Sequence, residues 1–140
     1  MINWGIIGFG NMGKQYAKCF REKSSTFNLI GIASKSKKDT IKDVEFFDNY
    51  DDLIKSESID AIYISTLNNS HKNLVCQVEK HNKKILCEKP LGMNLKEVEE
   101  MHRLFKDKKD SFLEAIAYRS HPQTEALLNL LEEKEFGEIK

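Results

Sequence analysis

The sequence has no excess of charge of either sign. Its 140 residues hold 22 Lys and Arg against 22 Asp and Glu, so the formal net charge is zero. A balanced chain has no general attraction to a polyanion or to a membrane surface. Neither nucleic acid nor a membrane is therefore expected as a partner.

Cysteine is scarce and forms no motif. Cys19, Cys76 and Cys87 are far apart, and no Cys-x-x-Cys spacing occurs. An odd number fits no closed disulfide framework. Reduced thiols in a cytoplasmic compartment are the simplest interpretation. His, Cys and carboxylate residues show no metal-ligand spacing, so no metal site is predicted.

Long apolar runs and linker-like segments are also missing. No run approaches the roughly 18 residues that a membrane-spanning helix needs, and no secretory signal is visible after Met1. The 2 prolines and 7 glycines form no rich linker. The apolar fraction of 40% argues against disorder, and the length suits one domain.

Short apolar runs alternate with helical patterns along the chain. Strands are predicted at residues 2–8, 28–34, 59–65, 84–87 and 111–117. Helices are predicted at residues 11–23, 70–82, 94–106 and 122–134, with at most a short helix at 51–55 and an irregular polar segment at 36–49. This alternation predicts a doubly wound, mainly parallel sheet with helices on both faces, a three-layer Rossmann-like α/β fold.

Three glycines follow the first predicted strand and open the first predicted helix. Gly8, Gly10 and Gly13 have the spacing Gly-x-Gly-x-x-Gly. In a dinucleotide-binding turn the first permits a tight turn, the second lets the backbone approach a pyrophosphate, and the third lets the helix pack closely. The pyrophosphate then lies at the helix N-terminus. The alternative is a strand-to-helix turn without a ligand.

The end of the second predicted strand bears on the choice of cofactor. In NAD sites an acidic residue about 20 residues after the glycines binds the ribose 2′-hydroxyl. Here Ser34 and Lys35 occupy this region, and no acid occurs between the end of the strand and Asp39. A hydroxyl and an ammonium would bind a 2′-phosphate, which favours NADP(H), with NAD(H) as the alternative. A solvated basic turn without a ligand is the simpler interpretation of the same residues.

A Glu-Lys-Pro turn follows the strand at residues 84–87. Glu88, Lys89 and Pro90 would lie at the carboxyl edge of the sheet, where open α/β sheets bind ligands. A lysine held there could orient a substrate hydroxyl or stabilise a developing alkoxide. Lys89 is therefore the candidate catalytic residue, and an ordinary Lys-Pro turn is the alternative.

Four motifs in order resemble one enzyme family. They are the glycine loop, "AIYISTLNNSH", "LCEKPLGMNLKEVEEM" and "FLEAIAYRSHPQ". Together they resemble the N-terminal half of the Gfo/Idh/MocA oxidoreductases over residues 2–140. "LCEKP" followed by "LEAIAYRSHP" is most similar to the dihydrodiol and sugar dehydrogenase branch, which tends to use NADP.

The resemblance implies a role for each residue that matches a family motif. It implies cofactor contacts from the glycine loop, from the end of the second strand, from the loop after residues 59–65 and from the Glu-Lys-Pro turn, and a substrate-side pocket wall after residues 111–117. The implied cofactor-binding residues are Gly8, Phe9, Gly10, Asn11, Met12, Gly13, Ser34, Lys35, Thr66, Asn68, His71, Glu88 and Lys89, and the substrate-side residues are Tyr118 and Arg119.

Two departures from the family pattern are visible. Family members carry a fuller helix after the second strand, whereas residues 40–50 are short and polar here, which predicts a weaker wall on the adenosine side. The family also commonly has proline where Leu67 stands, which would alter the course of that loop.

The resemblance also implies a domain organisation. Residues 1–120 are expected to form the dinucleotide-binding domain, and 121–140 a helix leading to a second domain, absent from this chain, that supplies the partner acid or base and most substrate contacts. The chain alone is then expected to be inactive, and the sheet to expose apolar surface where that domain would dock. A homo-oligomer or a separately encoded second half would be its protein partner.

Two functions follow from these expectations. The first is an NADP-dependent oxidoreductase of a sugar, polyol or related alcohol, of which this chain is the cofactor-binding half. The alternative is a stand-alone dinucleotide-binding or regulatory module without turnover. Retention of Lys89 favours the enzyme, because a pure binder has no need of it.

Overall fold

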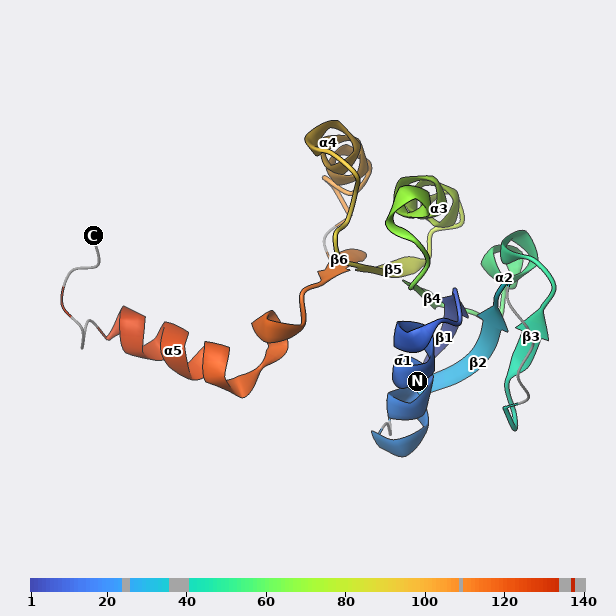
Figure 1. Cartoon of the computed structure of the whole chain (residues 1–140), viewed down its shortest axis with the longest axis horizontal. Helices are drawn as coiled ribbons and strands as arrows, with labels where there is room; N and C mark the ends of the chain where they lie inside the picture. The colour runs from blue at the N-terminus through green and yellow to red at the C-terminus, as the bar shows by residue number, and fades with distance from the viewer. Residues whose placement is uncertain (24–25, 36–40, 109, 134–136, 138–140) are drawn as a thin grey trace.

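Six short strands pair side by side in the computed structural model, which describes residues 1–23, 26–35, 41–108, 110–133 and 137. Every neighbouring pair is parallel, and the order is β3-β2-β1-β4-β5-β6 (Figure 1). The strands are β1 (Ile2–Ile7), β2 (Phe27–Ala33), β3 (Glu45–Phe47), β4 (Ala61–Ile64), β5 (Lys84–Glu88) and β6 (Phe112–Ala115). This order confirms the predicted Rossmann-like fold, and the reversal between β1 and β4 marks the ligand-binding edge.

Helices cover both faces of the sheet (Figure 1). Helix α1 (Asn11–Lys23) packs on one face. The other face carries α2 (Tyr50–Lys55), α3 (His71–Glu79) and α4 (Leu95–Leu104). The remaining elements are two short 3₁₀ turns, η1 (Asn68–Ser70) and η2 (Ala117–Ser120), and α5 (Pro122–Glu132).

The alternation of side chains along each strand divides the core into two layers. Ile6 and Tyr63 point to the α1 face, whereas Ile7, Ile62 and Ile64 point to the opposite face. All four residues of β4 are buried, as expected of a central parallel strand that is covered on both sides. The core therefore lies on both sides of β1 and β4, directly behind the glycine turn.

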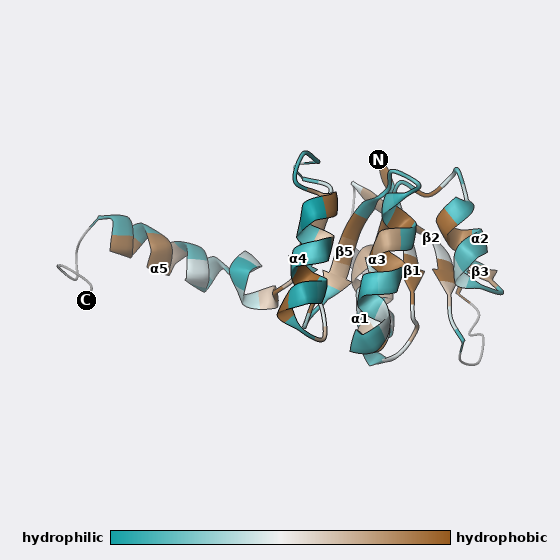
Figure 2. Ribbon diagram, turned by 90° about the horizontal axis from the view of Figure 1, so that it is seen from above, coloured by the Kyte–Doolittle hydropathy of each residue, from teal (hydrophilic) through white to brown (hydrophobic). Residues whose placement is uncertain are grey.

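The amphipathic helices meet this core with one apolar face each (Figure 2). On α3 the helical spacing predicts that Leu74, Val75 and Val78 point inward, and all three are buried. On α1 the spacing i, i+4, i+8 predicts one inward face of Met12, Tyr16 and Phe20. This is only partly right, because Tyr16 and Phe20 pack against the core while Met12 is 41% exposed. Met12 lies in the first turn of α1, at the mouth of the glycine loop.

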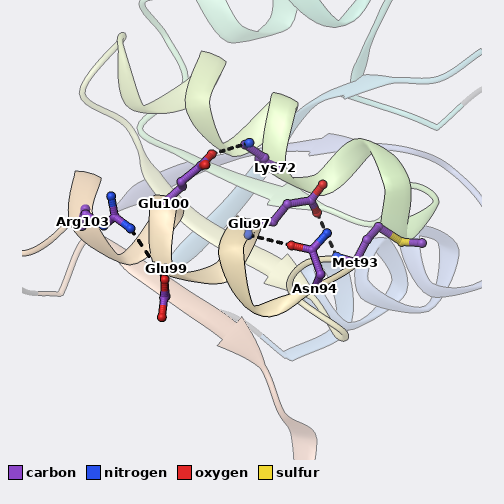
Figure 3. A network of polar contacts seen from close by, with 7 residues as sticks. All are labelled: Lys72, Met93, Asn94, Glu97, Glu99, Glu100 and Arg103. Carbon is purple, nitrogen blue, oxygen red and sulfur yellow. Dashed lines mark hydrogen bonds and ion pairs between the residues drawn. The ribbon is translucent and has the colours of Figure 1, made fainter.

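Helix α4 begins at a well-formed cap (Figure 3). The Asn94 side chain accepts a hydrogen bond from the Glu97 backbone N–H at 3.1 Å, and Glu97 Oε2 accepts from the Met93 N–H at 2.9 Å. Asparagine at the N-cap with glutamate three residues later predicts a capping box, and this reciprocal arrangement confirms it, with the return bond one residue earlier than in the usual motif. An ion pair between Lys72 and Glu100 joins α4 to α3.

The segment between β2 and α2 differs from the prediction of irregular structure at residues 36–49. Residues 45–47 form β3, and Phe46 and Phe47 each pack half-buried against one of the two core layers. The apolar pair is too short to produce a period-2 pattern, so its pairing with β2 is a tertiary effect. The segment that was expected to give a weak wall on the adenosine side thus contains a strand. The basic residues 37 and 38 lie outside the described residues.

Helix α5 extends away from the sheet (Figures 1 and 2). His121 caps it by accepting a hydrogen bond from the Gln123 N–H at 3.1 Å, and Pro122 opens its first turn. The helix buries no residue, and its Leu127 and Leu128 are about half exposed. The predicted boundary between residues 120 and 121 stays a prediction.

Within the part of the chain that the structure describes, no helix is long and apolar enough to cross a bilayer.

The central position of β4 makes its inward side chains the strongest stability test. Ile62→Ala should lower the free energy of unfolding by about 2–5 kcal/mol, because it removes a fully buried side chain and leaves a cavity. Urea unfolding followed by circular dichroism measures this. Leu67→Ala, at a 78% exposed position, is the control and should change stability by less than about 0.5 kcal/mol. A loss below about 1 kcal/mol for Ile62→Ala would contradict the assigned core.

Candidate functional site

Gly8 makes the turn between β1 and α1. Its φ of +92° is a conformation that other residues rarely adopt, and a Cβ there would lie 2.8 Å from the Ser65 carbonyl oxygen. The Gly8 N–H donates to the Ala33 carbonyl at 2.9 Å, and Ser65 Oγ donates to the Gly8 carbonyl at 2.8 Å. These bonds fix the turn against the ends of both neighbouring strands, β2 and β4.

The other two glycines are required for different reasons. A Cβ at Gly13 would collide with the Gly8 carbonyl oxygen, so Gly13 lets α1 pack against the turn. A Cβ at Gly10 would meet nothing within 4 Å and would project into open space. Packing of the protein alone thus demands glycine at 13, whereas at 10 the room in front of the backbone is free for a ligand.

The N-terminus of α1 faces this free space. Asn11 and Met12 are its first residues, and the first turn contains no acidic residue. The first N–H groups of a helix have no partner within the helix, and the helix dipole favours an anion there. Phe9 is buried and packs edge-on against Phe46 at 5.8 Å, so it supports the loop from behind. These residues fit a dinucleotide pyrophosphate.

The end of β2 lies beside the same turn, since Gly8 is hydrogen-bonded to Ala33. Ser34 and Lys35 therefore follow the strand next to the loop, as predicted. The Lys35 ammonium lies 5.6 Å from the centre of the Tyr50 ring, at the start of α2. A hydroxyl and a cation are thus present at the strand end where the ribose of a dinucleotide is bound.

The loop after β4 is held by its own side chains. Thr66 Oγ1 and Ser70 Oγ are 2.6 Å apart, and Asn68 is exposed at the start of η1. Leu67 has a φ of −70°, a value that a proline ring would also impose, so the backbone here is compatible with either residue. The expectation that this loop departs from the family pattern stays a prediction.

His71 lies beneath this loop and connects it to the Glu-Lys-Pro turn. Its ring is fully buried, with Nδ1 3.0 Å from the Pro90 carbonyl oxygen and Nε2 3.2 Å from the Thr66 carbonyl oxygen. The structure therefore gives His71 a bracing role between two loops. Its direct contact with a cofactor stays a prediction, as do those of Thr66 and Asn68.

Glu88 is the last residue of β5 and is buried beside an exposed Lys89. The Tyr63 hydroxyl donates to Glu88 Oε1 at 2.6 Å, and Glu88 Oε2 accepts from the Lys89 N–H at 3.2 Å. Burial and then the Glu88 carboxylate raise the pKa of Tyr63 well above its ordinary value, so Tyr63 remains a donor. Glu88 is thus positioned from below and in turn holds the Lys89 backbone.

A cavity of about 670 Å³ lies along β6 and continues past its carboxyl end. Tyr16 and Leu86 form part of its wall, and Arg119 lines it. The substrate-side role of Arg119 stays a prediction. Tyr118 is 67% exposed, and Leu113 on the same strand is 63% exposed. Arg119 and Lys89 follow adjacent strands, because Glu88 pairs with Ala115 in the sheet register.

Three residues of this edge were given no role in the sequence analysis, although two of them lie within a quoted family motif. Ser65 secures Gly8, and Tyr63 secures Glu88. Lys14 follows the third glycine directly, and its ammonium lies 5.6 Å from the centre of the Phe9 ring. Only Lys14 had a visible signal, a cation in the first turn of a helix with an anion-binding N-terminus.

Thiol and metal chemistry have little support at this edge. Burial raises the pKa of the Cys87 thiol to about 12, which leaves it protonated and unreactive at neutral pH. Among the residues that the structure describes, no three His, Cys, Asp or Glu side chains lie close enough together to hold a metal ion.

The fold and the glycine turn define a dinucleotide-binding α/β domain. Residues 2–115 match the family model described as "Oxidoreductase family, NAD-binding Rossmann fold". The chain therefore belongs to the Gfo/Idh/MocA family of NAD(P)-binding oxidoreductases.

Curated relatives include trans-1,2-dihydrobenzene-1,2-diol dehydrogenases. The proteins from Bos taurus and Homo sapiens are each 28% identical to this chain over 149 residues. The alignment covers 99% of this chain and 44% of each relative. The chain thus spans less than half the length of the curated relatives that it matches.

Solved structures share the fold. Scyllo-inositol dehydrogenase from Lactobacillus casei, with bound NAD(H) and scyllo-inositol, matches with a TM-score of 0.87 and 21% identity, over 99% of this chain and 43% of that one. Myo-inositol 2-dehydrogenase from Lactobacillus plantarum matches with a TM-score of 0.84 and 23% identity, over 99% and 43% of the two chains.

The two glycines with different surroundings give a matched test of the ligand space. Gly10→Ala should leave the free energy of unfolding within about 1 kcal/mol of the wild type, because its Cβ meets no protein atom. The same change should raise the Kd for a nicotinamide dinucleotide by about tenfold or more, because the Cβ would stand where the pyrophosphate approaches. Isothermal titration calorimetry measures the Kd.

Gly13→Ala is the companion variant and should behave in the opposite way. Its Cβ collides with the turn itself, so the protein should lose about 1–3 kcal/mol of stability without any ligand. If Gly10→Ala binds the dinucleotide as tightly as the wild type, the ligand does not lie in front of Gly10.

Proposed function

We propose that this chain is the dinucleotide-binding part of an NADP-dependent oxidoreductase that acts on a sugar, polyol or related alcohol. The open space in front of Gly10 at the N-terminus of α1 is the observation that carries the binding function. Dihydrodiol and inositol dehydrogenases among its relatives support an alcohol or diol as the substrate class. NADP⁺ or NADPH would accept or supply the hydride.

The end of β2 supports NADP(H) over NAD(H). Ser34 and Lys35 stand where an NAD-specific site would carry a carboxylate for the 2′-hydroxyl. A carboxylate there would repel a 2′-phosphate, whereas the ammonium attracts it. Hydrogen bonds to charged groups contribute about 1.5–3 kcal/mol, or roughly 10- to 150-fold in affinity.

Lys89 is the proposed catalytic residue. Its side chain is exposed at the carboxyl edge, while Glu88 holds its backbone N–H. An ammonium there would hydrogen-bond the substrate hydroxyl and stabilise negative charge that develops on its oxygen. Tyr118 and Arg119 would form the substrate side of the same edge, with Arg119 on the cavity wall.

The cofactor preference is tested by titration with NADPH and with NADH. The wild type should bind NADPH roughly 10- to 150-fold more tightly than NADH. Lys35→Ala should remove most of this difference by weakening NADPH binding, while the Kd for NADH stays within about twofold. Equal affinities in the wild type, or tighter binding of NADH, would overturn the assignment of NADP(H). Binding of neither dinucleotide would overturn the binding function itself.

The role of Lys89 is tested in the complete gene product, with any polyol or diol that it turns over. Lys89→Ala should lower kcat by about 10²-fold or more, the usual contribution of a positioned acid or base. The Kd for NADPH should stay within about threefold, which separates catalysis from cofactor binding. Full turnover by the variant would exclude Lys89 from the reaction. A chain that binds NADPH but lacks turnover in every form would instead support a regulatory module.

A further inference from the structure

Tyr50 contacts the charged end of Lys35. Its ring lies beneath the Lys35 ammonium, 5.6 Å from ring centre to Nζ. One aromatic side chain therefore lies under the cation of a residue that follows the end of β2.

Tyr50 is itself well anchored. It is the first residue of α2, which Asn49 caps by accepting a hydrogen bond from the Asp52 N–H at 2.8 Å. Its ring is half-buried and packs against the core layer that contains Leu53 and Ile54. The ring is therefore a fixed surface under the exposed Lys35 side chain.

Two acidic residues, Asp51 and Asp52, follow Tyr50 in the first turn of α2. Asp52 Oδ2 accepts a hydrogen bond from the Asn49 side chain at 2.7 Å. Asp51 lines a separate small cavity between α2 and α3, together with Lys55 and Lys80. The Asp52 carboxylate thus has its own partner, Asp51 lies at a different cavity, and the cation of Lys35 lies over the Tyr50 ring.

We propose that Tyr50 is the positioning residue that holds Lys35 for the 2′-phosphate of NADP(H), and so sets the preference for this cofactor. The inference rests on the proposed function, since it gives a cause for the NADP(H) preference. A lysine that is free in solution must be ordered before it binds a phosphate, and ordering such a side chain weakens binding. An ammonium seated on a ring face keeps donors free on its far side.

Three variants test the contact between Tyr50 and Lys35. Tyr50→Leu removes the ring and the hydroxyl and should weaken NADPH binding about three- to tenfold, with the Kd for NADH within twofold. Tyr50→Phe keeps the ring and should retain at least half of the NADPH preference. Tyr50→Leu combined with Lys35→Ala should bind NADPH no more weakly than Lys35→Ala alone, because Tyr50 acts through Lys35.

Phe47→Leu is the matched control. It removes a half-buried ring from the neighbouring β3 strand and the same core layer. This variant should change the Kd for NADPH and the Kd for NADH by the same factor. Thermal unfolding of each variant checks that the fold is intact.

The outcomes distinguish this inference from the function on which it rests. If the wild type prefers NADPH and Tyr50→Leu keeps the full preference, or if Tyr50→Leu weakens both cofactors equally, Tyr50 does not position Lys35 and the inference is wrong. If the double variant is weaker than Lys35→Ala, Tyr50 acts on its own. If the wild type itself shows no preference, the assignment of NADP(H) fails and the inference fails with it.

Discussion

The close approach of backbone to backbone at Gly8 and Gly13 is the constraint on which the site depends. A side chain at either position would strike the main chain of Ser65 or of Gly8 itself. The contact draws the start of α1 onto the carboxyl ends of β1, β2 and β4 at once, through the hydrogen bonds of Gly8 to Ala33 and of Ser65 to Gly8. It leaves the N–H groups of the first turn of α1 facing outward at the point where the strand order reverses.

The rest of the edge is built by side chains that reach from one loop to the next. Tyr16 on α1 stacks on Tyr63, with ring centres 4.0 Å apart, and Tyr63 holds Glu88. His71 joins Thr66 to Pro90 from the opposite face. Because these groups are buried and paired, the glycine turn and the Lys89 turn are positioned by one connected set of contacts. The residues exposed above them, Lys35 and Lys89, are the ones proposed to meet cofactor and substrate.

The sequence alone predicts the fold class and the glycine turn, and physical reasons explain what it misses. A strand with four consecutive apolar residues, such as β4, can be recognised in the sequence. Strand β3 has only two phenylalanines in a polar segment, and it forms because β2 and α2 lie beside it. The motifs identify Glu88 and His71, but as ligands for a cofactor. Their burial and their hydrogen-bond partners depend on the tertiary structure. The contact of Tyr50 with Lys35 does so too, because no sequence spacing links a loop residue to a helix that begins fifteen positions later.

The most direct test of the account is amide chemical-shift mapping of the chain with NADPH by ¹⁵N–¹H NMR. The central claim is that the dinucleotide lies across the glycine turn, with its pyrophosphate at the start of α1. The account predicts the largest shifts at the amides of Gly10, Asn11 and Met12, with a second group at the end of β2. Shifts confined to α4 or α5, or a spectrum unchanged at saturating NADPH, would contradict it.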